Sequence, residues 1–263
     1  MKELILIKLG GSVITDKRRK FTAREGNIKR FAGEIKSALK TFKGDIIIGH
    51  GAGSFAHTPA SKYQTKKGLT NKNSLTGMVI VEDVARRLNA IVIKEFLLKN
   101  LSVFPFSPAS FIISDAKGDS KSYVDPVKCA LRVGIIPVVY GDVIMDEKTG
   151  CTIFSTEKVL SILAKKLKAY YKIRMVYVTD VDGVYDKNGK TILVMSSKNL
   201  DRLKTSITGA KNADVTGGMM HKVEESLKLA EETGIRTLIV NGIKIGELKR
   251  AVLGEKVDGT LVS

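Results

Sequence analysis

Short apolar runs rich in Ile and Val alternate along this chain with longer amphipathic patterns. The runs are too short for helices and are expected to be buried strands, at residues 4–9, 45–49, 102–106, 136–140, 173–179 and 236–240. Between them, apolar residues recur at intervals of three and four, which predicts helices over 27–42, 74–99, 125–133, 156–170 and 218–233. This alternation favours a three-layer α/β/α sandwich with a mostly parallel central sheet.

Two acidic-glycine stretches, residues 146–150 and 186–189, lie between apolar runs and predict antiparallel turns. The last hundred residues restart the alternation of strand and helix, but no Pro- or Ser-rich linker precedes them. We therefore expect residues 1–263 to form a single domain, with two approximate lobes at 1–165 and 166–263.

The net charge of +17 suits an anionic partner: a nucleic acid, an acidic membrane face or phosphorylated small molecules. The basic residues are spread in doublets, the chain has no Trp, and no aromatic residues are interleaved with the basic ones, which disfavours nucleic acid. No apolar run approaches the roughly 18 residues of a membrane span, so a cytoplasmic protein is expected. Cys129 and Cys151 lack metal-ligand spacing and are expected to be unreactive thiols.

The stretch GHGAGSFAHTPASKY, residues 49–63, follows the second expected strand and holds His50 and His57. Its GAGSFA segment satisfies the GxGxxG/A pattern of dinucleotide-binding loops. Pro59 is expected to prevent a helix from opening there, and the acid required about 20 residues later is absent. A dinucleotide site is therefore disfavoured, and the stretch is predicted to be an open loop in which His50 has only a structural role.

Three other glycine-containing stretches carry lysines or carboxylates at expected strand ends or a helix start. They are KLGGSVITDK at 8–17, TDVDGVY at 179–185 and DVTGGMMHK at 214–222. Glycine lets backbone N–H groups approach phosphate closely, and lysine supplies charge. Together the three stretches predict a polyphosphate site, although no GxxxxGK[ST] loop is present.

These stretches, with HGAGSFAH, IPVVYGDV and the closing LGEKVDGTLV, resemble the amino-acid kinase superfamily and, within it, the isopentenyl phosphate kinases. The resemblance covers essentially the whole chain in order. It implies transfer of the γ-phosphate of ATP to isopentenyl phosphate, with Mg²⁺ carried by the nucleotide and no dedicated protein metal site. It also implies a homodimer, with an acceptor-binding lobe at 1–165 and a nucleotide-binding lobe at 166–263.

By the same resemblance, Lys8, Lys17 and Lys222 neutralise the phosphates during transfer. The implied nucleotide-binding residues are Lys8, Gly10, Gly11, Ser12, Gly53, Asp180, Asp182, Gly218 and Lys222. A lysine inside the apolar first strand is costly unless its charge has a partner, which independently favours a site at Lys8. Asp182 precedes Gly183, so a plain turn is an equally good explanation for it.

On the acceptor side, the resemblance implies that His57 binds the phosphate of isopentenyl phosphate and that Ala52 and Gly53 present backbone. Met78, Val79 and Val81 are candidates for an apolar pocket, although such residues more often belong to an ordinary core.

The chain departs from the family pattern at FSTEKV, where Thr156 replaces a substrate-contacting glycine and Glu157 replaces a lysine-ordering aspartate. The implied roles are substrate contact for Thr156 and lysine bridging for Glu157. A smaller change places Ala56 before His57. These changes leave open another phosphate or phosphonate acceptor, such as fosfomycin, or a nucleotide-binding protein without transferase activity.

Overall fold

The computed structural model describes residues 1–115, 120–200 and 218–263, and all six predicted strands are present. They are β1 (Lys2–Leu9), β2 (Asp45–His50), β3 (Val103–Pro105), β6 (Ile136–Tyr140), β9 (Tyr171–Thr179) and β11 (Thr237–Asn241). Within the described residues they join β12 (Gly259–Val262) and β10 (Val194–Met195) in one sheet of order β10-β12-β11-β9-β1-β2-β6-β3. In this sheet, as far as the structure describes it, only β11 and β12 pair antiparallel, so the predicted mostly parallel sheet is confirmed.

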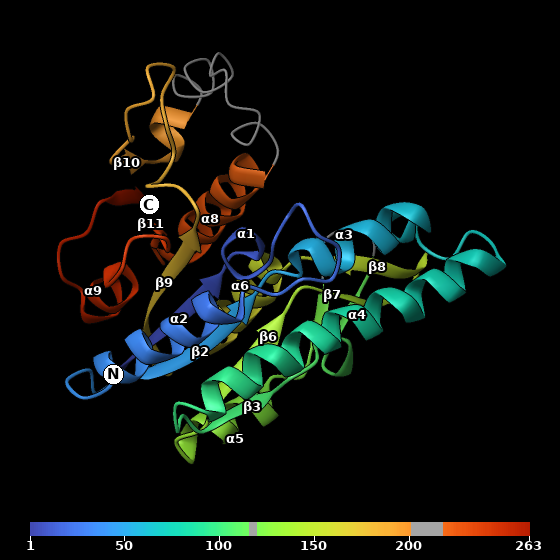
Figure 1. Ribbon diagram of the computed structural model, residues 1–263, viewed down its shortest axis with the longest axis horizontal. Coiled ribbons are helices and arrows are strands. Elements are labelled where there is room, and N and C mark those ends of the chain that lie inside the picture. Colours follow the sequence, from blue (N-terminus) through green and yellow to red (C-terminus); the bar gives the residue numbers. More distant parts are fainter. Residues whose placement is uncertain (116–119, 201–217) are drawn as a thin grey trace.

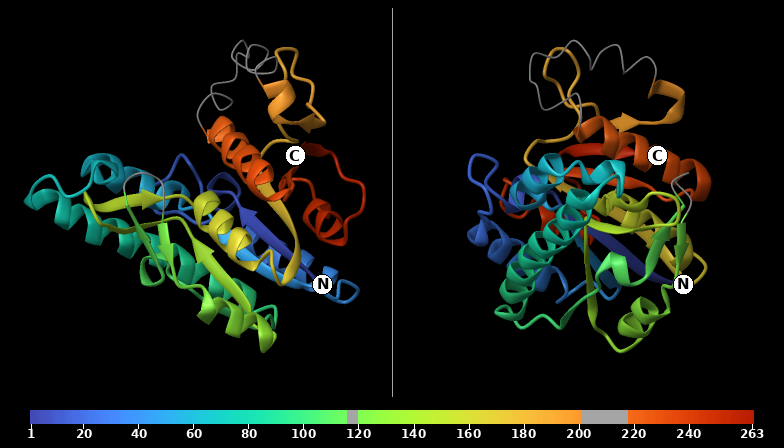
Figure 2. Two further views of the ribbon diagram at one scale, coloured as in Figure 1. Left: turned by 180° about the vertical axis from the view of Figure 1, so that it is seen from behind. Right: turned by 90° about the vertical axis from the view of Figure 1, so that its right-hand side faces the viewer.

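Helices cover both faces of this sheet, as predicted (Figure 1). One face carries α2 (Glu25–Ala38), α4 (Lys72–Leu97) and α9 (Glu247–Leu253). The other carries α5 (Asp125–Arg132), α6 (Thr156–Leu167) and α8 (Met220–Thr233), and Figure 2 shows α6 and α8 from behind. The sheet runs without a break through both expected lobes, because β1 of the first pairs with β9 of the second.

Strand β1 is central and divides the core between the two faces. Leu4 and Leu6 belong to the apolar cluster under α6 and α8, whereas Ile5 and Ile7 belong to the cluster under α2 and α4. Since side chains alternate along a strand, Lys8 continues the row of Leu4 and Leu6. The lysine is therefore directed under the start of α6 rather than into solvent.

A smaller sheet lies beyond the carboxyl ends of the main strands, against α4 (Figure 1). Its order is β5 (Ser120–Ser122), β4 (Ile112–Ser114), β7 (Asp142–Asp146) and β8 (Gly150–Phe154). The predicted turn at 146–150 is the β7–β8 connection, in which Asp146 accepts hydrogen bonds from the N–H groups of Lys148 and Thr149. The turn at 186–189 closes an isolated antiparallel bridge between Tyr185 and Thr191.

The predicted open loop after β2 is wrong, because residues Gly53–Lys62 form helix α3 with Pro59 inside it. Pro59 removes one backbone donor, but Phe55 is only 2% exposed and Pro59 is buried, so packing outweighs the lost hydrogen bond. The argument against a dinucleotide site therefore rests only on the missing acid. The short helices α1 (Gly11–Ile14), η1 (Thr65–Lys67) and η2 (Pro108–Ser110) were not predicted either.

Replacing Gly53 by alanine is expected to destabilise the fold by about 3 kcal/mol. The residue has φ of +48°, and an added Cβ would lie 2.1 Å from Thr15 Oγ1. Gly26→Ala is the matched control, since Gly26 lies in α2 with nothing within 4 Å, and it should stabilise by about 0.5–1 kcal/mol. Urea unfolding of both variants checks this, and equal midpoints would contradict it.

Candidate active site

A cavity of about 840 Å³ lies at the carboxyl ends of β1, β2, β6 and β9. The first turns of four helices, α1, α3, α6 and α8, also border it, through Gly11, Gly53, Thr156 and His221. Helix N-termini present unpaired N–H groups and partial positive charge, so their convergence favours an anionic ligand. This is also the edge at which open parallel sheets bind ligands.

Two glycine loops meet on the floor of this cavity. A Cβ on Gly11 would lie 2.7 Å from the Cα of Gly53, and one on Gly51 would lie 2.9 Å from the backbone nitrogen of Gly11. Gly10 is equally confined, since its Cβ would lie 2.7 Å from the carbonyl oxygen of Val178. The glycines therefore allow the backbones of neighbouring loops to touch, and the same loops line the cavity.

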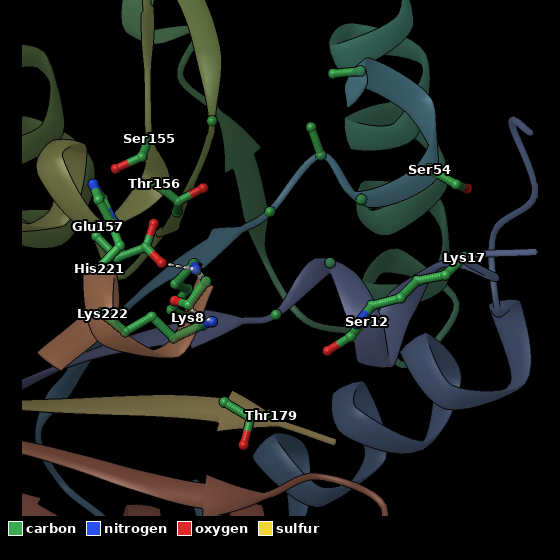
Figure 3. A pocket seen from close by; sticks show the side chains of 18 of the residues that line it. Lys8, Ser12, Lys17, Ser54, Ser155, Thr156, Glu157, Thr179, His221 and Lys222 are labelled. Atoms are coloured by element: carbon green, nitrogen blue, oxygen red, sulfur yellow. Dashed lines mark hydrogen bonds and ion pairs between the residues drawn. The ribbon is translucent and has the colours of Figure 1, made fainter. Parts of the chain in front are cut away.

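Lys8 and Glu157 form a buried ion pair that spans from β1 to the start of α6 (Figure 3). Their side chains are only 7% and 8% exposed. Burial opposes ionisation of Glu157, but the charge and hydrogen bond of Lys8 outweigh it, and the charge of Lys222 adds to them, so the pKa falls to about 2. Glu157 is therefore ionised at neutral pH, and its carboxylate holds the Lys8 side chain at the cavity wall.

The other two predicted lysines reach the same cavity from different elements. Lys222 extends from the first turn of α8, donates to the carbonyl of Gly218 at 2.9 Å and lies beside Lys8 and Glu157 (Figure 3). Lys17 follows α1, with its Nζ 3.9 Å from Asp180 Oδ2. Three cations separated by up to 214 positions in the sequence thus face one space; residues 214–217 of the DVTGGMMHK stretch lie outside the described residues.

The two predicted aspartates after β9 have different surroundings. Asp180 lines the cavity and accepts a hydrogen bond from Ser12 Oγ at 2.8 Å. Asp182 is not among the lining residues; it accepts a hydrogen bond from Asn241 at 2.9 Å and pairs with Lys244 at 2.8 Å. This arrangement fits the turn explanation for Asp182.

The closing stretch LGEKVDGTLV holds the turn that follows β9. The hydroxyl of Thr260 accepts from the N–H of Val184 at 2.8 Å and donates to the carbonyl of Ile192 at 2.6 Å. Gly183 has φ of +155°, and a Cβ there would lie 2.5 Å from Thr260 Oγ1. This stretch therefore shapes the loop that follows β9 and does not itself line the cavity.

Thr156 lines the cavity, but its hydroxyl hydrogen is already used. The hydroxyl donates to the carbonyl of His50 at 2.7 Å, and the residue is 2% exposed. If the predicted substrate contact of Thr156 were a hydrogen bond donated by its hydroxyl, the bond to His50 would have to break. Ser155 caps α6 by accepting from the N–H of Lys158.

The acceptor-side candidates are placed only in part. Ala52 and Gly53 line the cavity at the start of α3. His57 lies within α3, but its side chain lies outside the part of the chain that the structure describes. Its contact with a substrate phosphate therefore stays a prediction.

One end of the cavity is apolar. Ala56 and Ala60 from α3, Val81 from α4 and Ile153 from β8 line it. Met78 packs against the small cluster of Val81, Val143 and Cys151 behind this end. Val79 is 61% exposed, so its candidacy for an apolar pocket is wrong.

Several lining residues were not predicted, among them Arg18, Lys20, Asp142 and His221. The run RRK directly after Lys17 was a signal for the first two. Asp142, from the quoted IPVVYGDV stretch, accepts from Ser107 Oγ at 3.1 Å, and burial raises its pKa to about 7. Its 2% exposure could not be inferred from the sequence, in which it is an acidic residue shortly after an apolar run.

His50 is buried, as its predicted structural role requires, and burial lowers its pKa to about 4 despite hydrogen bonds that favour protonation. Between about pH 6.5 and pH 4, His50 binds a proton in the unfolded chain but not in the folded one. The free energy of unfolding therefore falls as pH falls. We expect His50→Asn to remove up to about 3 kcal/mol of this acid dependence. Urea unfolding at several pH values in this window measures it, and parallel curves would contradict the assignment.

Comparisons with known proteins identify the family of this chain. Residues 3–241 match the model of the amino acid kinase family, so the chain belongs to that family. It is similar to isopentenyl phosphate kinase of Methanothermobacter thermautotrophicus, at 34% identity with 99% of each chain covered. The Methanocaldococcus jannaschii enzyme of the same name is 32% identical over 98% of this chain and 97% of its own.

A solved structure described as "X-ray structures of isopentenyl phosphate kinase" superposes with a TM-score of 0.84. It is 30% identical and covers 99% of this chain and 100% of its own. The amino-acid kinase fold predicted from the sequence is thereby confirmed. Among the described residues, none of the helices is long and apolar enough to cross a membrane.

Proposed function

We propose that this protein is an isopentenyl phosphate kinase that converts isopentenyl phosphate and ATP into isopentenyl diphosphate and ADP. The observation that carries the proposal is one cavity with three lysines and four helix starts around its polar part and an apolar end. Such a cavity suits a molecule with a phosphate at one end and a short hydrocarbon chain at the other. The full-length similarity to isopentenyl phosphate kinases supports it.

In this reaction an oxygen of the acceptor phosphate forms a bond to the γ-phosphorus of ATP. The bond from that phosphorus to the β,γ-bridging oxygen breaks, and its electron pair stays with ADP. Such transfer needs alignment and positive charge more than covalent chemistry from the protein. Lys8, Lys17 and Lys222 would supply the charge. The N–H of Gly10 already donates to the carbonyl of Val178 at 2.9 Å, so the backbone donors to phosphate would come from Gly11 and Ser12.

The nucleotide would lie toward the carboxyl end of β9 and the start of α8, and the acceptor toward α3 and β8. These positions correspond to the proposed nucleotide-binding lobe, 166–263, and acceptor-binding lobe, 1–165. Mg²⁺ would be held mainly by the nucleotide phosphates, where it offsets their charge. Asp180 is a carboxylate in reach of that region, with a side chain 35% exposed.

The test is ADP formation by the purified protein with Mg²⁺ and ATP, with isopentenyl phosphate, dimethylallyl phosphate or fosfomycin as the acceptor. Turnover on the first two supports the proposal. Turnover on fosfomycin alone would assign the same fold to another acceptor. ATP binding without turnover on any of the three would favour a nucleotide-binding protein and would reject the proposal.

We expect His57→Ala to lower kcat/KM for the acceptor by about 100-fold while changing the KM for ATP little, because the predicted contact is to the acceptor phosphate. Ser61→Ala is a control on the exposed end of the same helix and should leave both parameters near wild type. Steady-state kinetics with each substrate varied separates the two effects. An unchanged acceptor kcat/KM in His57→Ala would remove the assignment.

We also propose a cytoplasmic homodimer. Exposed apolar residues support self-association: Leu97, Leu98 and Phe104 are 52%, 63% and 52% exposed, and β3 is an edge strand. Light scattering of the purified protein measures its mass in solution, and a monomer at micromolar concentration would reject the dimer.

A further inference from the structure

His50 lies at the end of β2 with no exposed surface and two oxygen neighbours. Its ring stacks on Tyr140 with 5.5 Å between the ring centres. Nε2 lies 3.1 Å from the side-chain oxygen of Asn89 in α4, and Nδ1 lies 3.3 Å from the carbonyl oxygen of Gly51. Because burial lowers the pKa of His50 to about 4, the ring is neutral at pH 7 and carries a single N–H.

A neutral imidazole cannot donate to both oxygens, since one ring nitrogen donates and the other accepts. If Nε2 carried the hydrogen, the lone pair of Nδ1 would face the lone pairs of the Gly51 carbonyl. The side-chain amide of Asn89 has two ends of equal shape, and turning it by about 180° places an N–H₂ group against Nε2. Nδ1–H then donates to Gly51, and both contacts become favourable.

The resulting chain of hydrogen bonds has a direction: Asn89 donates to His50, and His50 donates to Gly51. It ends at the peptide between Gly51 and Ala52, and the orientation of this peptide decides where the Ala52 N–H points. In a trans peptide the C=O and the following N–H point in opposite directions. With the carbonyl of Gly51 held toward His50, the N–H of Ala52 is held away from it, and both residues line the cavity.

The other contacts of Gly51 do not involve its carbonyl, so His50 sets the orientation of the peptide between Gly51 and Ala52. The Gly51 N–H donates to the carbonyl of Leu9 at 2.9 Å, the residue directly after Lys8. A Cβ at Gly51 would lie 2.9 Å from the backbone nitrogen of Gly11, so the loop packs closely against the first glycine loop. The amino side of Gly51 is thus tied to β1, while its carbonyl side is tied to the imidazole.

We propose that Asn89 and His50 are positioning residues that aim the Ala52 N–H at the phosphate of the acceptor. The two residues do not touch substrate; they act through the Gly51 peptide. This inference rests on the proposed function for the identity of the acceptor, a phosphate monoester, but the hydrogen-bond direction can be tested without turnover.

The first experiment measures the tautomer of His50 by ¹⁵N NMR of the imidazole in the full chain at pH 7, with His50→Asn used to assign the signal. Protonation at Nδ1 is expected. Protonation at Nε2 would overturn the proposal, whether or not the protein phosphorylates isopentenyl phosphate.

The second experiment compares two amides that replace different ends of the ring. The side-chain N–H₂ of His50→Asn falls near the position of Nδ1 and can donate to Gly51, whereas that of His50→Gln falls near Nε2 and can contact only Asn89. Both variants lose the ring that stacks on Tyr140, so their thermal midpoints should fall similarly. We expect kcat/KM for isopentenyl phosphate to be about 10-fold lower in the glutamine variant than in the asparagine variant.

The KM for ATP should be alike in the two variants, because the Ala52 N–H is assigned to the acceptor. Equal acceptor kcat/KM in both, at equal stability, would reduce His50 to a purely structural residue and reject the proposal. If wild type phosphorylates none of the three acceptors, the proposed function fails, and the tautomer alone decides the hydrogen-bond direction.

Discussion

Replacing Lys8 by methionine is expected to lower kcat by about 1,000-fold, because the transferring phosphoryl group loses the cation fixed most rigidly in the cavity. Methionine keeps most of the volume and the apolar contacts of the lysine stem. Lys8 stands out among the three lysines because its ammonium is buried and bonded to Glu157. Its position is therefore preorganised before any substrate arrives.

The same substitution has a second expected effect, on stability. It leaves Glu157 buried without its partner, which costs about 3–5 kcal/mol or forces the carboxylate to take up a proton. The double variant Lys8→Met/Glu157→Gln removes both charges and should recover most of that stability. Thermal unfolding and initial rates of the single and double variants separate the two effects. Recovered turnover in the double variant would show that Lys8 has only a structural role.

Lys222→Ala is expected to lower kcat by about 100-fold with little change in stability. Lys222 lies in the first turn of α8, where its Nζ donates to the carbonyl of Gly218 at 2.9 Å, and it lines the same cavity as Lys8. Its side chain can move to a bound phosphate, so its contribution should appear in turnover rather than in folding.

Lys228→Ala provides the matched control, because Lys228 is an exposed lysine on the same helix and does not line the cavity. It loses the same charge from α8 and should keep near wild-type kcat. Steady-state kinetics at saturating ATP and acceptor compares the two. Equal activity in the Lys222 and Lys228 variants would show that Lys222 contributes only to the general positive charge of the protein.

The fold was readable from the sequence because its strands are buried on both faces. The run LILIKL is apolar at nearly every position, which favours a strand buried on both faces, and β1 does pair with β2 on one side and β9 on the other. Helix α3 could not be predicted, because proline usually ends a helix. The burial of Phe55 and Pro59 in the folded protein makes this helix favourable.

The three lysines of the site were predicted from motifs, but their geometry was not. That Glu157 would reach Lys8 required the start of α6 to lie over the end of β1, and no local pattern encodes a contact between residues 149 positions apart. The sequence also gave no reason to pair His50 with Asn89, since α4 reads as an ordinary amphipathic helix until the tertiary structure turns Asn89 inward.

By itself, the order of apolar runs, glycine loops and lysines determined the class of sheet, the edge that binds ligand and the phosphate chemistry, because these follow from local periodicity and from residue type. Only the tertiary structure decided which lysine pairs with Glu157, that the Thr156 hydroxyl is already bonded, and how the Gly51 peptide is oriented. Those features depend on contacts between segments that are distant in the sequence. Burial in the folded protein determines which of these side chains are charged and in which direction their hydrogen bonds run.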